Sequence, residues 1–250
     1  MRTFIDWNCK ASAAFDMRLS SDYRLDGNRD FIETFAPKWL RPRQRIVDIG
    51  AGKNPFLPAE RKAALGAHVT GLDISAEELS RAPAAAYDEV ICADICSAAG
   101  EGDADLCICQ ALLEHVPDVQ AALVSIASFL KPGGVALVFV PSRNAVFARL
   151  NLLLPERLKR FVLFTVYPHA QRDQGFRSYY NRCTPADFRE MAREAGFEIV
   201  EQRLYFTSAY FTFFAPLHVA WRLWLLLFRQ VARAQAAETF SIALRKVAPS

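Results

Sequence analysis

The chain of 250 residues, 52% of them hydrophobic, is long enough for one α/β domain with a full core. Its net charge of +3 is small and its lysines and arginines are dispersed, which argues against a nucleic-acid partner. The six cysteines form no C-x-x-C pair, and the first residues lack the apolar region of a signal peptide. We therefore expect reduced thiols and a cytoplasmic protein.

Apolar periodicity predicts an N-terminal helical lead over residues 1–40, with helical spacing clearest at 29–40. Strand-like and helix-like runs then alternate. Strands are predicted at residues 45–49, 68–72, 89–92, 104–109, 134–140, 197–204 and 238–247, and helices at 57–65, 76–82, 118–130 and 184–195. Thr184 is the expected N-cap of the last helix, with Pro185 at its first position. This alternation predicts an α/β fold in which helices cover both faces of a mostly parallel, Rossmann-like sheet.

Two apolar segments, 144–167 and 205–228, interrupt this order. The second is about as long as a membrane span. A crossing helix there would separate the predicted strand 238–247 from its sheet, however. We therefore expect a single domain with a cofactor-binding core at 45–141 and insertions at 142–183 and 205–237. These insertions are expected to form a lid, an interface or a lipid-facing surface, because basic residues beside leucines and aromatics suit interfacial helices. Apolar stripes that pack into the core or a homodimer interface are the alternative.

The most informative motif is the glycine turn within residues 45–55, where the predicted strand 45–49 runs into Gly50, Ala51 and Gly52. Glycine permits positive φ and carries no Cβ, so a ligand can lie against bare backbone. A helix that begins near Pro55 is expected to add free N–H groups. The turn therefore predicts a nucleotide-type cofactor site.

Three aspartates, Asp48, Asp73 and Asp94, each lie at the carboxyl end of a predicted strand, where open α/β sheets bind ligands. Asp73 follows Gly52 by 21 residues, a spacing at which an acidic group can accept from both hydroxyls of a ribose. Asp94 can accept from an adenine amino group. A nicotinamide site would require a third glycine at position 55, which is Pro55 here, so the pattern argues against NAD.

Five motifs resemble the class I S-adenosylmethionine-dependent methyltransferases, and most closely the type-11 and ubiquinone-biosynthesis O-methyltransferase branch. They are Val47-Asp-Ile-Gly-Ala-Gly, Gly71-Leu-Asp-Ile-Ser, Ala93-Asp-Ile, the stretch Ala104-Asp-Leu-Cys-Ile-Cys-Gln-Ala-Leu-Leu-Glu-His-Val-Pro-Asp and Leu130-Lys-Pro-Gly-Gly. The likeness covers residues 45–141. It implies a seven-stranded sheet with an antiparallel last strand and S-adenosyl-L-methionine as cofactor. Where family members often have a third glycine, this chain has Asn54.

Carried over position by position, the resemblance implies a set of cofactor-binding residues. Asp48, Gly50, Ala51 and Gly52 face the methionine part, Asp73 binds the ribose, Ile74, Asp94 and Ile95 surround the adenine, and Gln110 lines the sulfonium pocket.

Methyl transfer to oxygen benefits from a nearby base, and His115 follows the fourth predicted strand at a suitable place. The alternative is a histidine that only holds its loop by hydrogen bonds. The related quinone O-methyltransferases have a Glu-x-x-Glu-His pattern associated with a divalent metal. The first of its glutamates is Ala111 here, and we therefore predict no metal.

The segment 167–182 is dense in polar and aromatic groups. It supplies a second candidate base, His169, and three candidate contacts to an acceptor or an anionic headgroup, Arg177, Tyr179 and Tyr180. An ordinary polar loop is the alternative. Together these patterns predict an S-adenosylmethionine-dependent methyltransferase that acts on oxygen of a small, lipid-linked or glycan-related acceptor, with peripheral contact to the inner face of the membrane. The alternative is a non-catalytic cofactor-binding or membrane-docking protein with the same fold.

Overall fold

The computed structural model describes residues 2–155, 177–208 and 210–248 of the chain. Its centre is a seven-stranded sheet in the order β3-β2-β1-β4-β5-β7-β6. The strands are β1 (Arg45–Ile49), β2 (His68–Asp73), β3 (Glu89–Cys92), β4 (Ala104–Gln110), β5 (Leu130–Pro141), β6 (Phe197–Tyr205) and β7 (Thr239–Lys246). Strands β1 to β5 pair in parallel, whereas β7 runs antiparallel to both β5 and β6. The predicted sheet with an antiparallel last strand is confirmed.

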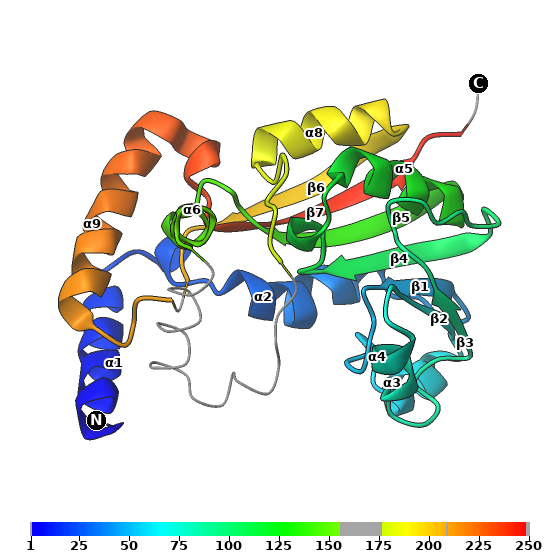
Figure 1. Ribbon diagram of the computed structural model, residues 1–250, viewed down its shortest axis with the longest axis horizontal. Coiled ribbons are helices and arrows are strands. Elements are labelled where there is room, and N and C mark those ends of the chain that lie inside the picture. Colours follow the sequence, from blue (N-terminus) through cyan, green and yellow to red (C-terminus); the bar gives the residue numbers. More distant parts are fainter. Residues whose placement is uncertain (1, 156–176, 209, 249–250) are drawn as a thin grey trace.

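Helices cover both faces of the sheet (Figure 1). On one face, α5 (Val119–Phe129) and α8 (Pro185–Glu194) contribute Leu123, Ile126, Phe188 and Met191 to a buried apolar cluster. On the other, α2 (Gly27–Asp30) and the turns after it place Phe31 and Phe35 in a second cluster with Leu106 and Leu137. The short helices α3 (Ala59–Leu65) and α4 (Ala76–Ser80) follow β1 and β2.

The strand predictions are confirmed to within a residue or two, except that β5 begins four residues earlier, at Leu130. The pairing of β4 with β5 shifts register between Ala104 and Leu106, and this irregularity accommodates the glycine-containing start of β5. Thr184 is the N-cap of α8, as predicted, and its side chain accepts from the Asp187 N–H.

Two helix predictions are corrected. No helix begins near Pro55. The residue before a proline is disfavoured in the α region, and Pro58 follows Leu57, so α3 begins only after Pro58. The Phe56 N–H, which was expected to be free, donates to the Asp48 carboxylate at 2.7 Å. The predicted helix 29–40 is divided into α2, a π-helical turn at Phe31–Phe35 and a 3-10 turn at Ala36–Trp39. Pro37 lies in the last of these turns and has no N–H to continue an α-helix.

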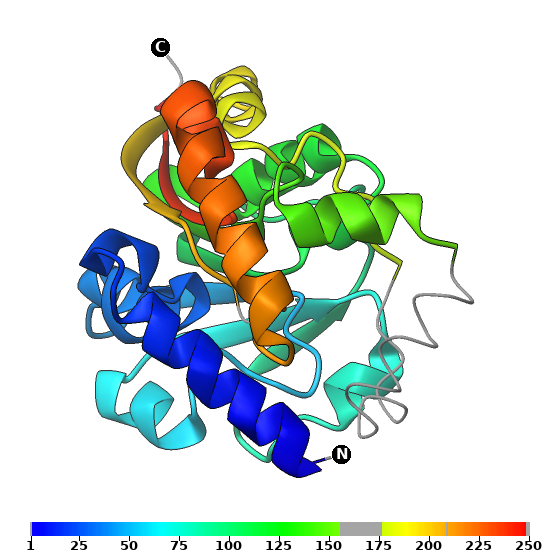
Figure 2. The same ribbon diagram turned by 90° about the vertical axis from the view of Figure 1, so that its left-hand side faces the viewer.

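The apolar segments form α6 (Val146–Leu153) and α9 (Ala215–Ala232). The remainder of the segment 144–167, from residue 156 on, lies outside the described residues. The N-terminal helix α1 (Arg2–Asp16) packs along α9 (Figure 2). In the part of the chain that the structure describes, no helix combines the length and the apolar character that crossing a membrane requires.

Candidate functional site

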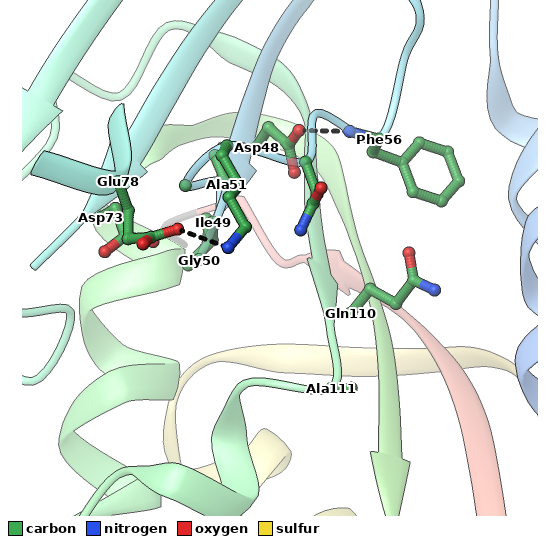
Figure 3. A pocket seen from close by; sticks show the side chains of 12 residues that line it. Asp48, Ile49, Gly50, Ala51, Phe56, Asp73, Glu78, Gln110 and Ala111 are labelled. Atoms are coloured by element: carbon green, nitrogen blue, oxygen red, sulfur yellow. Dashed lines mark hydrogen bonds and ion pairs between the residues drawn. The ribbon is translucent and has the colours of Figure 1, made fainter. Parts of the chain in front are cut away.

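A pocket of about 330 Å³ opens at the carboxyl ends of β1, β2 and β4 (Figure 3). Because these strands are parallel, their carboxyl ends meet at one edge of the sheet, where loops rather than ladder hydrogen bonds face the solvent. The pocket is lined by Asp48, Ile49, Gly50, Ala51, Gly52, Lys53, Asn54, Phe56, Asp73, Glu78, Gln110 and Ala111.

The glycine turn forms the floor of the pocket. Gly50 and Gly52 have φ values of +74° and +47°, in the region that favours glycine. The N–H groups of Gly50 and Ala51 both donate to the Leu72 carbonyl, at 2.8 and 3.2 Å, which fixes the turn against the end of β2. A Cβ at position 52 would lie 3.3 Å from the Asp73 carboxylate, so a larger residue would crowd the hollow between turn and carboxylate.

Asp48 closes the inner end of the pocket and is almost fully buried, with 6% of its surface exposed. Burial raises the pKa of its carboxyl to about 7, and the hydrogen bond from the Phe56 N–H opposes this shift only in part. A cationic ligand in the pocket would favour the ionised form of Asp48.

Two further carboxylates face the same hollow (Figure 3). Asp73, at the end of β2, accepts from the Ser75 N–H at 2.8 Å, and Glu78 lies in the first turn of α4, 3.7 Å from the Lys53 ammonium. The pocket thus holds three carboxylates and one lysine. This balance suits a ligand that brings positive charge and hydroxyl groups.

Gln110, the last residue of β4, forms the opposite wall, where its amide donates to the Asn28 side chain at 2.7 Å. Asn28 is held in place by its neighbours on α2. Asp30 accepts from Arg203 and from the Tyr205 hydroxyl, at 2.8 and 2.7 Å, and this ties α2 to the end of β6. The N-terminal segment therefore contacts Gln110, a wall residue, although Asn28 itself does not line the pocket.

The structure brings six of the predicted cofactor residues to the pocket, namely Asp48, Gly50, Ala51, Gly52, Asp73 and Gln110. Ile74, Asp94 and Ile95 do not line it. The Ile74 side chain is 60% exposed, whereas Ile95 packs in the core. Asp94 lies next to β2, because the Ala93 N–H donates to the Asp73 carbonyl, and its carboxylate accepts from the Cys96 N–H within its own turn. Contact of these three residues with an adenine stays a prediction.

Sequence reasoning missed six residues that line the pocket, namely Ile49, Lys53, Asn54, Phe56, Glu78 and Ala111, and it also missed Asn28, which contacts Gln110. Lys53 and Phe56 follow the glycine turn closely in the sequence. A prediction that extended the turn into a loop would have included them. Glu78 lies within a predicted helix, and no local signal marks it. Asn28 contacts Gln110 from a distant part of the sequence, so no local pattern indicates it.

His115 lies in a 3-10 turn, Leu113–His115, that follows β4. Its Nδ1 is 3.2 Å from the Arg177 carbonyl oxygen and 3.3 Å from the Ser178 hydroxyl, and its Nε2 is 3.7 Å from the Glu114 carboxylate. Burial raises the pKa of Glu114 to about 8. A carbonyl oxygen can only accept, so an Nδ1–H that donates to Arg177 leaves the lone pair on Nε2.

Of the three predicted acceptor contacts, Tyr180 packs into the core and is 4% exposed, a location that disfavours direct contact with an acceptor. Arg177 and Tyr179 are exposed, and the Arg177 guanidinium lies over the Tyr179 ring at 5.1 Å. His169 lies outside the described residues. Among the residues that the structure describes, no cluster of three or more His, Cys, Asp or Glu side chains could hold a metal ion.

Comparisons with known proteins agree with this geometry. A family model described as a methyltransferase domain matches residues 21–202. The ubiquinone biosynthesis O-methyltransferase of Thiobacillus denitrificans is 30% identical over 66% of this chain and 71% of its own length. Its counterpart in Cupriavidus pinatubonensis is 31% identical over 64% of this chain and 62% of its own length. The crystal structure of an S-adenosylmethionine-dependent methyltransferase from Mesorhizobium loti superposes with a TM-score of 0.55 at 19% identity, covering 88% of this chain and 100% of the other.

Proposed function

The chain belongs to the class I S-adenosylmethionine-dependent methyltransferases, and from this membership we propose that it methylates an oxygen atom of a small acceptor with an apolar, lipid-like portion. The choice of oxygen is supported by relatives about 30% identical that are named as O-methyltransferases of ubiquinone biosynthesis. The apolar portion is supported by the exposed leucines and aromatics of α6 and α9. A cytoplasmic location with peripheral contact to the membrane belongs to the same proposal.

S-adenosyl-L-methionine is the cofactor of this family, and the residues of the pocket fit it. The cofactor carries a positive sulfonium and an ammonium group, and the pocket offers three carboxylates against one lysine. The glycine turn leaves a bare backbone surface that a Cβ at position 52 would narrow. We propose that Asp73 accepts from the ribose hydroxyls, and that Asp48 and Gln110 face the methionine part.

The cofactor supplies an electrophilic methyl group, and the chain supplies alignment and a base. Gln110 lines the pocket, and its hydrogen bond to the Asn28 side chain holds its amide in place there. We propose that His115 takes the proton of the acceptor hydroxyl at Nε2, since its Nδ1 can donate to the Arg177 carbonyl. The exposed Arg177 and Tyr179 then lie close enough to His115 to contact an acceptor.

Calorimetry with S-adenosylmethionine and with its demethylated product tests the cofactor site, and we expect micromolar binding of both. Transfer of a labelled methyl group to phenols and catechols, with and without a polyprenyl tail, tests the acceptor. The tailed acceptors should be preferred. Binding without transfer to any of them would instead favour a non-catalytic role.

The variant His115→Ala tests the base. We expect it to lower kcat about 100-fold or more while cofactor affinity stays unchanged. His68→Ala is the matched control, because His68 lies at the start of β2, away from the pocket. Equal loss of activity in both variants would refute the role of His115.

A further inference from the structure

Helix α9 is unusual for a surface helix because its solvent-facing side is apolar. Exposure rises along this side to 53% at Trp224, 68% at Leu227 and 85% at Val231. The side that faces the protein carries His218 and Arg222, which are 0% and 1% exposed, beside the buried apolar Trp221 and Leu225. A surface helix in water normally presents polar and charged residues to the solvent.

The hydrogen bonds of Arg222 and His218 fix which side of α9 faces the protein. The Arg222 guanidinium donates to the Asp16 carboxylate of α1 at 2.7 Å and to the backbone carbonyls of Phe206 and Tyr23. The His218 Nε2 lies 3.0 Å from the same Asp16 carboxylate. Turning the apolar side of α9 inward would break these bonds and leave a buried guanidinium without partners, which is costly. The apolar side must therefore stay outward.

Helices α1 and α6 lie on either side of α9 (Figure 2), and the exposed apolar surface extends onto both. Between α9 and α6 lies a hollow of about 580 Å³, to which Leu150 and Trp224 contribute. On the α1 side, Trp7 is 65% exposed and borders a second hollow, of about 550 Å³, next to Pro216. Contiguous apolar surface of this kind marks an interaction site.

The charges around this surface identify its occupant. Neither α6 nor α9 contains an aspartate or a glutamate. The exposed charged residues that line the two hollows are Arg149 and Arg18, Arg233 follows the end of α9, and the exposed Asp6 adjoins Trp7 on α1. A twofold contact centred on α6 and α9 would set their arginines against one another, with no carboxylate on either of these two helices to pair. Anionic lipid headgroups are complementary to it, and tryptophan suits the boundary between headgroups and acyl chains.

We propose that α9, together with α6 and the start of α1, is the surface by which this protein docks on an anionic lipid bilayer. Docking would bring the chain to an acceptor that resides in the bilayer, and in this respect the inference rests on the proposed function. Helices α6 and α9 follow the carboxyl ends of β5 and β6, and the cofactor pocket lies at the carboxyl ends of β1 and β4, at the same edge of the sheet. A bilayer on this surface therefore lies at the edge from which an acceptor must enter.

Vesicle flotation of the full chain tests the proposal, with vesicles of phosphatidylcholine alone and of phosphatidylcholine mixed with phosphatidylglycerol. We expect the protein to float with the anionic vesicles, and added salt to weaken this binding. The double variant Leu227→Asp/Val231→Asp should reduce partitioning about tenfold or more. Its matched control is Val124→Asp, on the solvent side of α5, where valine is 52% exposed and where we expect no loss.

Flotation requires neither cofactor nor acceptor, so its outcome is separate from that of methyl transfer, and cofactor calorimetry checks that each variant is folded. Three results would overturn the docking proposal. They are no flotation of the wild type, equal flotation with both kinds of vesicle, and a double variant that floats like the wild type. A wild type that sediments as a dimer, and a double variant that sediments as a monomer, would assign the surface to a second copy instead.

Discussion

Replacing Asp48 with asparagine should stabilise the fold at alkaline pH and weaken cofactor binding at the same time. Burial raises the pKa of Asp48 from its ordinary value of 3.8 to about 7. At about 1.36 kcal/mol per unit, ionisation of Asp48 costs the folded state on the order of 4 kcal/mol relative to the unfolded chain. Asparagine keeps an oxygen for the Phe56 N–H and has no charge to bury.

The stability of the wild type should fall as the pH rises, because the pKa of Asp48 is raised on folding. A group whose pKa is raised on folding contributes stability below its unfolded pKa, and this stability is lost as the pH rises through the folded value. Between about pH 5 and about pH 8, the wild type should therefore lose about 3 kcal/mol relative to Asp48→Asn. Urea unfolding followed by tryptophan fluorescence at the two pH values measures this difference.

The control is Glu238→Gln, because Glu238 is also buried, with a pKa raised to about 7, but does not line the cofactor pocket. Both variants should become relatively more stable as the pH rises. Only Asp48→Asn should weaken binding of S-adenosylmethionine, by about tenfold near pH 8, because it removes a carboxylate that faces the cation. A stability difference that is the same at both pH values would refute the assigned burial cost.

Two further predictions concern the walls of the pocket. Asp73→Asn should weaken cofactor binding by about 1–2 kcal/mol, whereas Asp94→Asn, outside the pocket, should have a smaller effect; calorimetry on both decides whether the adenine reaches Asp94. Gly27→Ala should lower the free energy of unfolding by about 1–3 kcal/mol, because its Cβ would lie 2.6 Å from the Tyr205 ring. Urea denaturation measures this loss, and an unchanged midpoint would show that α2 is not held as described.

The strands and the glycine turn could be predicted because their signals are local. A buried strand is indicated by Val47 and Ile49, and the turn without side chains is indicated by the two glycines that follow within a few residues. The start of α3 was predicted to within two residues by the helix at 57–65, but the expected start near Pro55 was wrong. No local pattern indicates that the Phe56 N–H donates to Asp48.

Features of the site that depend on residues far apart in the sequence could not be predicted from local sequence patterns. Asn28 reaches Gln110 only because Asp30 is bound by residues of β6, far away in the sequence. Which side of α9 faces the solvent could not be predicted from local patterns either. Its sequence shows leucines and tryptophans, but only the partnership of Arg222 with Asp16 decides which side faces outward. Trp221, for example, turns out to be 4% exposed, unlike its neighbour Trp224.

The attachment of α2 to the last strands has a consequence for synthesis on the ribosome. A nascent chain that has emerged through β5 already contains the glycine turn and Gln110, but not Arg203, Tyr205 or Thr239, against which Gly27 and Asp30 are packed. Asn28 therefore cannot be positioned until β6 and the start of β7 have been synthesised. We expect ribosome-bound intermediates that lack β6 and β7 to bind the cofactor weakly. Full affinity should appear only once these two strands have joined the sheet.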